Sequence, residues 1–148
     1  MEETSDLESR ETRVARRRRV FTLQQANSTL PLVARIVDDI VGLYRKITAV
    51  QQELASDSIN PADRESIERV AQQQEQRFEQ FVDELSDIGC ELKDANTGLV
   101  DFIGRHEGRE ICLCWRQGEA RIEFWHDLHT GLAGRKPIDT LHESPVAV

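Results

Sequence analysis

Apolar residues recur at heptad spacing in the first half of the chain, and this pattern restricts the fold more than any other feature. The two core positions of every heptad are apolar; the residues are Val33, Ile36, Ile40, Leu43, Ile47, Val50 and Leu54. Such a repeat is typical of an amphipathic helix that packs lengthwise against another helix. At a helical rise of about 1.5 Å per residue, this seam is about 30 Å long. The helix therefore needs a partner of similar length.

A second helix supplies that partner. Asn60 is a favourable N-cap, Pro61 occupies the preferred first helical position, and Gly89 is a typical C-cap residue. Six of its seven seam positions are apolar; the seam consists of Ile67, Ala71, Gln74, Phe78, Phe81, Leu85 and Ile88. Because residues 55–60 form only a short connection, the pattern predicts a long antiparallel, coiled-coil-like helical hairpin.

The chain before the heptads contains a helix start and a helix breaker. Thr22 and Gln25 form a capping-box pattern, which predicts a first short helix from Leu23 to about Leu30. Pro31 lacks the backbone N–H that a continuing helix requires. We therefore expect a kink or a restart at Pro31.

The second half of the chain has the composition of β-structure. Three segments, 99–103, 110–115 and 121–126, read as strands separated by short turns. Strand alternation predicts one apolar face that covers the hairpin; its residues are Ile111, Leu113, Trp115, Ile122 and Phe124. The fold class is therefore α+β, a helical hairpin followed by a small three-stranded antiparallel β-meander. Residues 131–148 show no clear element.

The length of 148 residues favours one domain. We expect a disordered charged tail over residues 1–19, a single α+β domain over 20–140 and a C-terminal tail over 141–148. The arginine run from Arg13 to Arg19 leaves several roles open, namely contact with RNA, with acidic lipid or with the protein's own acidic surface, or simple solvation. The net charge of −8 argues against nucleic-acid binding by the folded domain.

The expected compartment is the cytoplasm. No run of about 18 apolar residues is present to span a membrane, and residues 1–20 lack the pattern of a secretory signal. The three cysteines, Cys90, Cys112 and Cys114, are read as reduced thiols.

Polar residues that carry chemistry concentrate in the predicted meander. The first and third strands run parallel, so Asp101 and His126 share one edge of the sheet, to which Arg135 can return from the C-terminal loop. We expect a ligand-binding site there; its candidate residues are Lys93, Asp94, Asp101, His126 and Arg135. A carboxylate, an imidazole and a guanidinium can bind an anion or move a proton. The secondary candidates are Cys114, Arg116 and Glu119, of which the last two fit a hairpin turn. Alternatively, these residues only cap strand ends.

The sequence gives less support to a metal site or to a nucleophilic cysteine. His126 and His129 are possible metal ligands beside Cys112 and Cys114, but Cys-x-Cys is not the usual zinc spacing, and small buried thiols are the competing interpretation. No cofactor is therefore expected. A phosphate nest at residues 131–136 is a further alternative. Burial would silence Cys114 as a nucleophile.

Several short strings resemble an uncharacterised prokaryotic family, domain of unknown function 2203. In the first half they are Phe21-Thr22-Leu23, Ala26-Asn27 and Leu30-Pro31-Leu32-Val33. In the second half they are Glu91-Leu92-Lys93-Asp94, Thr97-Gly98-Leu99-Val100-Asp101-Phe102, Leu113-Cys114-Trp115-Arg116, Gly118-Glu119, Trp125-His126, Gly131, Gly134-Arg135 and Pro137-Ile138-Asp139. The resemblance covers about residues 20 to 140. It implies a fold and a compartment but no activity.

Two functions remain in view. The sequence favours a small cytosolic binding or protein-interaction module, with a protein partner or a homodimer formed through the hairpin. The alternative is an enzyme or a metal- or anion-binding protein with its site on the meander and C-terminal loop. The alternative is favoured if one pocket is lined by Asp101, Cys114, Arg116, Glu119, His126 and Arg135. The interaction module is favoured if these residues point apart into solvent.

Overall fold

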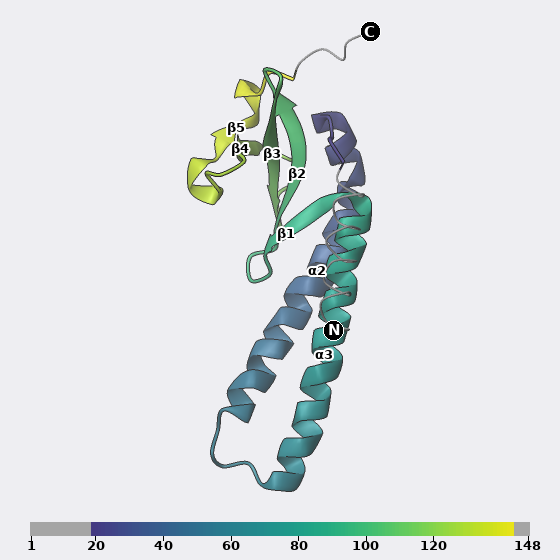
Figure 1. Cartoon of the computed structure of the whole chain (residues 1–148), viewed down its shortest axis with the longest axis vertical. Helices are drawn as coiled ribbons and strands as arrows, with labels where there is room; N and C mark the ends of the chain where they lie inside the picture. The colour runs from purple at the N-terminus through teal and green to yellow at the C-terminus, as the bar shows by residue number, and fades with distance from the viewer. Residues whose placement is uncertain (1–18, 144–148) are drawn as a thin grey trace, which may run out of the picture.

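The computed structural model describes residues 19–143, which form a long helical hairpin with a sheet packed against one end (Figure 1). The helices are α2 (Leu23–Leu54) and α3 (Pro61–Ile88). The strands are β1 (Cys90–Asp94), β2 (Leu99–His106), β3 (Arg109–Arg116), β4 (Phe124–Asp127) and β5 (Lys136–Pro137). Two short 3₁₀ turns, η1 (Leu132–Gly134) and η2 (Ile138–Thr140), flank β5. Residues 1–18 of the predicted tail 1–19, and residues 144–148 of the predicted C-terminal tail 141–148, lie outside the described residues.

Helix α2 begins as predicted but does not break. The Gln25 backbone N–H donates to the Thr22 hydroxyl, and the Thr22 N–H donates to the Gln25 side chain, which completes the capping box. The predicted end of a first short helix near Leu30 and its restart after Pro31 are wrong, because α2 continues through that residue. Leu30 and Val33 are both buried on either side of the proline. Packing on both sides outweighs the roughly 3 kcal/mol that an internal proline costs.

Helix α3 forms the predicted antiparallel partner. The Asp63 N–H donates to the Asn60 side chain at its start, and Gly89 ends it in the left-handed conformation, with φ of 112°. Arg64 fastens the connection between the helices, since its guanidinium donates to the carbonyl oxygens of Leu54 and Ser56. None of the helices described here is long and apolar enough to cross a membrane.

The sheet has five antiparallel strands in the order β1-β2-β3-β4-β5, so the predicted count of three is too low. The predicted strands are the three central ones, β2, β3 and β4. Strand β1 starts directly after the Gly89 cap, where no turn signal separates it from the helix. Strand β5 has only two residues, and one of them, Pro137, has no N–H to donate.

Strand β4 begins at Phe124 rather than at Arg121 as predicted. The backbone N–H of Ile122 donates to the side-chain oxygen of Asn27 on α2, at 2.8 Å. This segment therefore bonds to the helix before it joins the sheet. Ile122 nevertheless lies in the core, as its apolar character predicts.

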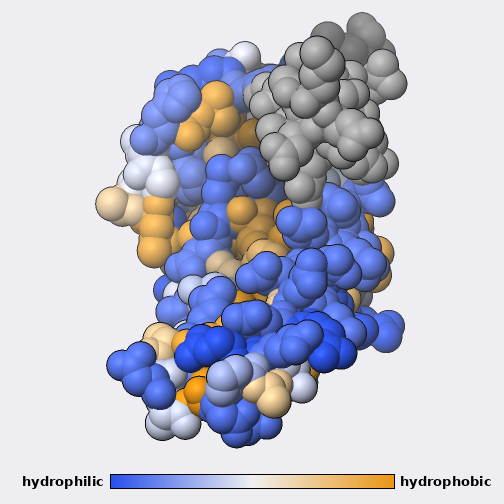
Figure 2. All heavy atoms as spheres, turned by 60° about the horizontal axis from the view of Figure 1, so that its bottom comes forward, coloured by the Kyte–Doolittle hydropathy of each residue, from blue (hydrophilic) through white to orange (hydrophobic). Residues whose placement is uncertain are grey.

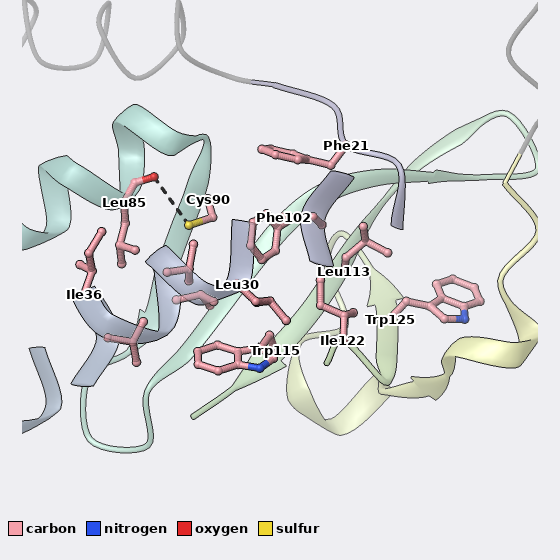
Figure 3. Packing of buried hydrophobic residues seen from close by; sticks show 14 of the residues in the cluster. Phe21, Leu30, Ile36, Leu85, Cys90, Phe102, Leu113, Trp115, Ile122 and Trp125 are labelled. Atoms are coloured by element: carbon pink, nitrogen blue, oxygen red, sulfur yellow. Dashed lines mark hydrogen bonds between the residues drawn. The ribbon is translucent and has the colours of Figure 1, made fainter. Parts of the chain in front are cut away.

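The core lies between the first half of α2 and one face of the sheet, as alternation predicts for Ile111, Leu113 and Trp115. Figure 3 shows Leu30 among Phe102, Leu113, Trp115 and Ile122. Eight residues of α2 are buried, whereas α3 buries only Leu85. The sheet therefore covers one end of the hairpin. The other end consists of two helices alone, and Figure 2 shows it as mostly hydrophilic, with small hydrophobic patches.

Candidate functional site

The face of the sheet that points away from the helices carries a buried polar cluster. Ile111, Leu113 and Trp115 point into the core, so the residues between them, Cys112 and Cys114, lie on the opposite face. Strand register places Asp101 beside Cys114 and His126 beside Cys112. All four side chains are buried, and none is more than 5% exposed; they are Asp101, Cys112, Cys114 and His126.

Asp101 and His126 meet above the strand that separates them. Asp101 belongs to β2 and His126 to β4, and the Asp101 Oδ2 atom lies 3.1 Å from the His126 Nε2 atom. The other ring nitrogen, Nδ1, lies 2.7 Å from the carbonyl oxygen of Asp127. A carbonyl oxygen only accepts hydrogen bonds, so Nδ1 carries the proton. In a neutral imidazole the Nε2 lone pair then points at the Asp101 carboxylate.

Cys114 receives a hydrogen bond from the C-terminal loop. The Arg135 Nε–H donates to Cys114 Sγ at 3.3 Å, and the two terminal nitrogens of Arg135 donate to the Glu119 carboxylate at 2.9 and 3.4 Å. Burial raises the pKa of the Cys114 thiol to about 11, although the hydrogen bond from Arg135 acts in the opposite direction. Arg135 also lies over the ring of Phe124, at 4.3 Å from its centre. The loop is thus fixed over the cluster.

Asp101 has one oxygen without a partner. Its Oδ1 atom is buried and makes no hydrogen bond among the described residues. Leaving such an atom unpaired typically costs about 1–3 kcal/mol. The ligand atoms of Asp101, Cys114 and His126 all lie within 4.8 Å of one another, and no other group of three metal-ligating side chains gathers in this way within residues 19–143.

The profile of an uncharacterised conserved protein family, domain of unknown function 2203, matches residues 19–138. The chain belongs to this family. The matched span includes the whole polar cluster and Arg135, and it confirms the resemblance of the sequence strings. No curated protein matches the chain, and no solved structure does.

Two of the five primary candidate residues do not join the cluster. The Asp94 carboxylate accepts hydrogen bonds from the Asn96 N–H and the Thr97 hydroxyl, so it serves the turn before β2. Lys93 pairs with Glu91 at 3.1 Å on the sheet edge, although its charge also acts on Asp101 and Cys112. Asp101 and His126 touch, and Arg135 reaches the cluster through its hydrogen bond to Cys114, from the side of Glu119 rather than from the predicted edge.

Arg116 and Glu119 lie at the predicted hairpin turn. The Arg116 N–H donates to a Glu119 side-chain oxygen at 2.6 Å, and the Glu119 N–H donates to the Arg116 carbonyl oxygen at 3.0 Å. Glu119 has a second role that its turn position did not indicate, since it also holds Arg135. The Arg116 side chain is exposed and stays outside the cluster.

The two histidines considered as metal ligands from the sequence lie in different surroundings. His126 is in the cluster, but His129 is exposed and lies beyond the end of β4. Sequence reasoning did not combine Asp101, Cys114 and His126 as one ligand group. The alternation that puts Cys112 and Cys114 on one face was visible, yet the register between strands was not.

Proposed function

We propose that this protein binds a divalent transition-metal ion, with zinc the best fit, through Asp101, Cys114 and His126. The state of His126 carries the proposal. Its Nδ1–H donates to the Asp127 carbonyl, and metal-bound histidines usually donate their second ring N–H to just such a group. The Nε2 lone pair is thereby directed at the point where Asp101 and Cys114 converge.

The donor spacing supports a tetrahedral ion. With metal–nitrogen and metal–oxygen bonds near 2.0 Å and a metal–sulfur bond near 2.3 Å, tetrahedral donors lie roughly 3.3–3.6 Å apart. The Asp101 and His126 donors are 3.1 Å apart, and all three donors lie within 4.8 Å. Side-chain adjustments of about 1 Å suffice. Thiolate, imidazole and carboxylate together suit zinc or a chemically similar ion.

Without a metal ion, the contact between Asp101 and His126 needs a proton at the position that the ion would occupy. Asp101 Oδ2 and His126 Nε2 are both acceptors in their basic forms, so their 3.1 Å contact requires a proton between them. A metal ion replaces that proton and the proton on the Cys114 thiol, and it offers a partner near the unpaired Asp101 Oδ1. The three unpaired cysteines suit a reducing compartment such as the cytoplasm.

The burial of the cluster favours a binding role over an enzyme. A nucleophilic cysteine needs an accessible thiol with a lowered pKa. Cys114 is fully buried, and burial raises the pKa of its thiol to about 11. Without a metal ion, such a protonated thiol is a poor nucleophile. A bound ion would displace its proton and make it a metal ligand.

Zinc titration with a matched pair of cysteine variants tests the proposal. A ligand that binds only the native state stabilises it, and zinc at a hundredfold excess over its dissociation constant should raise Tm by roughly 10 °C in a chain of this size. The full-length protein should show this shift and bind one equivalent of zinc in equilibrium dialysis. Cys114→Ser should lose the shift.

Cys90→Ser is the matched control. Cys90 is also a buried thiol, but it lies in the core between helix and sheet, where its Sγ donates to the Leu85 carbonyl oxygen (Figure 3). The same chemical change there should lower the metal-free Tm and leave the zinc-induced shift intact. An unchanged Tm of the wild-type protein at every zinc concentration would contradict the proposal.

A second candidate function is self-association through the uncovered half of the hairpin, which would make the seam part of a coiled-coil-like bundle. The observation that favours it is the exposure of α3, whose seam is only half-buried apart from Leu85. Val70 on α3 is 45% exposed and Tyr44 on α2 is 36% exposed. A second hairpin packed alongside would bury both.

Sedimentation equilibrium decides this candidate. The wild-type chain should be dimeric at micromolar concentration, and Val70→Glu should shift it to a monomer, because the carboxylate would lie in the new interface. Gln76→Glu adds the same charge at a polar position of the same helix and should leave the dimer intact. A wild-type monomer at all concentrations would eliminate this function.

A further inference from the structure

The cluster contains a fourth possible ligand that the three-residue group leaves out. Cys112 lies two residues before Cys114 on β3, on the same face of the sheet, and it is directly opposite His126 on β4. It is 5% exposed. Its surroundings are those of the proposed centre, since the charges of Asp101, Lys93 and Cys114 all act on it.

We infer that Cys112 is the fourth ligand of the proposed metal centre and closes it as a four-coordinate structural site. This inference rests on the proposed function. It changes the expected class of the site, because a catalytic zinc keeps one position open for water or substrate, whereas a structural zinc is held by four protein ligands.

Strand register carries the inference. Asp101 approaches from β2 beside Cys114, and His126 approaches from β4 beside Cys112. The two side chains meet at 3.1 Å, and because β3 lies between their strands, the meeting point lies above β3. Cys112 and Cys114 flank that point along the strand. The four side chains therefore start around one position from three adjacent strands, and three of their donor atoms already meet there.

The two cysteines are close enough to share an ion. Residues two apart on one strand are separated by about 6.6 Å along it. A metal with two thiolate bonds of about 2.3 Å can bridge Cβ atoms roughly 6.5 Å apart at a near-tetrahedral angle. The Cys112 Sγ is not within the 4.8 Å group, so a rotation about its χ1 must bring it to the ion.

Burial and charge favour a chain ligand over an external one. The side chains around the meeting point are at most 5% exposed, which leaves no open face for a substrate. Two thiolates and one carboxylate on a divalent cation leave one net negative charge. The ammonium of Lys93, whose charge acts on both Cys112 and Asp101, offsets it.

Cobalt substitution of the full-length protein counts the thiolate ligands. Thiolate-to-cobalt charge transfer gives near-ultraviolet absorption that grows with the number of Co–S bonds, while the visible bands report tetrahedral geometry. Cys112→Ser should bind cobalt with about half the charge-transfer absorption of the wild type, since one of two thiolates is lost. Cys90→Ser, which removes a thiol outside the site, should give the full wild-type spectrum.

X-ray absorption of the zinc-loaded wild-type protein gives the same count without any variant. It should show two sulfur ligands near 2.3 Å and two nitrogen or oxygen ligands near 2.0 Å. A single sulfur, or full charge-transfer absorption in Cys112→Ser, would overturn the fourth ligand and leave the three-ligand site standing. Failure of the wild type to bind either metal would instead refute the proposed function, and this inference with it.

Discussion

The carboxylate of Asp101 and the imidazole of His126 are joined at 3.1 Å across a strand that belongs to neither of them. Strands β2 and β4 do not pair with each other, so this contact adds a side-chain link above β3. Both residues are almost fully buried. A proton in the metal-free state, or an ion in the proposed bound state, holds the same two groups together. The pair therefore links the proposed metal binding to the integrity of the sheet.

The first prediction concerns this pair in the absence of metal. Asp101→Ala should lower the free energy of unfolding by about 1–3 kcal/mol in the presence of a chelator, because it leaves the buried Nε2 atom of His126 without its hydrogen-bond partner. Urea denaturation measures the change. Asp94→Ala makes the same substitution at the turn before β2 and should cost less than about 1 kcal/mol, because the hydrogen bonds that it removes are exposed. If the two variants lost equal free energy of unfolding, the buried pair would contribute no more to stability than the exposed turn.

The second prediction is the pH dependence of zinc affinity. Burial raises the thiol pKa to about 11 at Cys114 and to about 12 at Cys112, so both thiols are protonated at neutral pH and zinc must displace their protons. The ion displaces the proton shared by Asp101 and His126 as well as the Cys114 proton, so the affinity should rise about a hundredfold per pH unit between pH 6.5 and 8, and about a thousandfold if the Cys112 thiolate also binds. Chelator competition measures it. An affinity that does not change with pH would exclude thiolate ligands.

The third prediction is a loss of stability at alkaline pH in the metal-free protein. The folded-state pKa values of Cys90, Cys112 and Cys114 are raised to about 12, 12 and 11 from a usual value of 9.0. Below pH 9 the thiols are protonated in both states, and their contribution to stability is fully present. Above pH 9 only the unfolded chain ionises, so stability should fall by about 1.4 kcal/mol per pH unit for each thiol. Urea titrations at pH 8 and 10 measure how much the free energy of unfolding falls over this range. Cys90→Ala should reduce that fall by the contribution of one thiol.

Local sequence patterns predicted those features of the fold that are determined by residues within a single helix or strand. The two long helices that the heptads predict, the Thr22 capping box and the Gly89 cap each depend on residues close in sequence, and each is seen. Tertiary contacts overrode the patterns elsewhere. Packing on both sides of Pro31 keeps α2 continuous, and a hydrogen bond to Asn27 delays the start of β4.

Only the part of the candidate site that follows from strand direction could be predicted from the sequence. Parallel first and third strands predicted that Asp101 and His126 share an edge, and they touch. Which thiol joins them depends on register, which a single sequence does not contain. His129, three residues beyond His126, looked equivalent in sequence. It lies past the strand end, where the backbone no longer directs it to that face.

The fourth prediction concerns the hairpin. Ile40 on α2 is fully buried, so Ile40→Asp would bury an unpaired carboxylate and should unfold the protein. The neighbouring Asp39 is exposed, and Asp39→Ala should change the free energy of unfolding by less than about 0.5 kcal/mol. Circular-dichroism melts of the two variants test this. A wild-type midpoint for Ile40→Asp would mean that this seam position is not core.

The fifth prediction concerns the close approach between the sheet and α2 at Gly98. This glycine has φ of 69°, and a Cβ atom there would lie 2.8 Å from Gln117 Cβ and 2.9 Å from Val37 Cγ1. Gly118 has a similar positive φ of 97° but open space around it. Gly118→Ala should therefore cost only the backbone strain, about 1–2 kcal/mol. Gly98→Ala should cost about 1–3 kcal/mol more, because the helix must move away from the sheet.

Denaturant unfolding of the two alanine variants compares the costs, since both carry backbone strain but only Gly98→Ala adds a steric clash. The extra loss at Gly98 should also disturb the neighbouring hydrogen bond from the Gln117 side chain to Asp38 on α2, at 2.7 Å. Adding Gln117→Ala should then cost less in the Gly98→Ala background than in the wild type. Identical losses for the two glycine variants would show that α2 does not press against this turn, contrary to the packing that fixes the sheet on the hairpin.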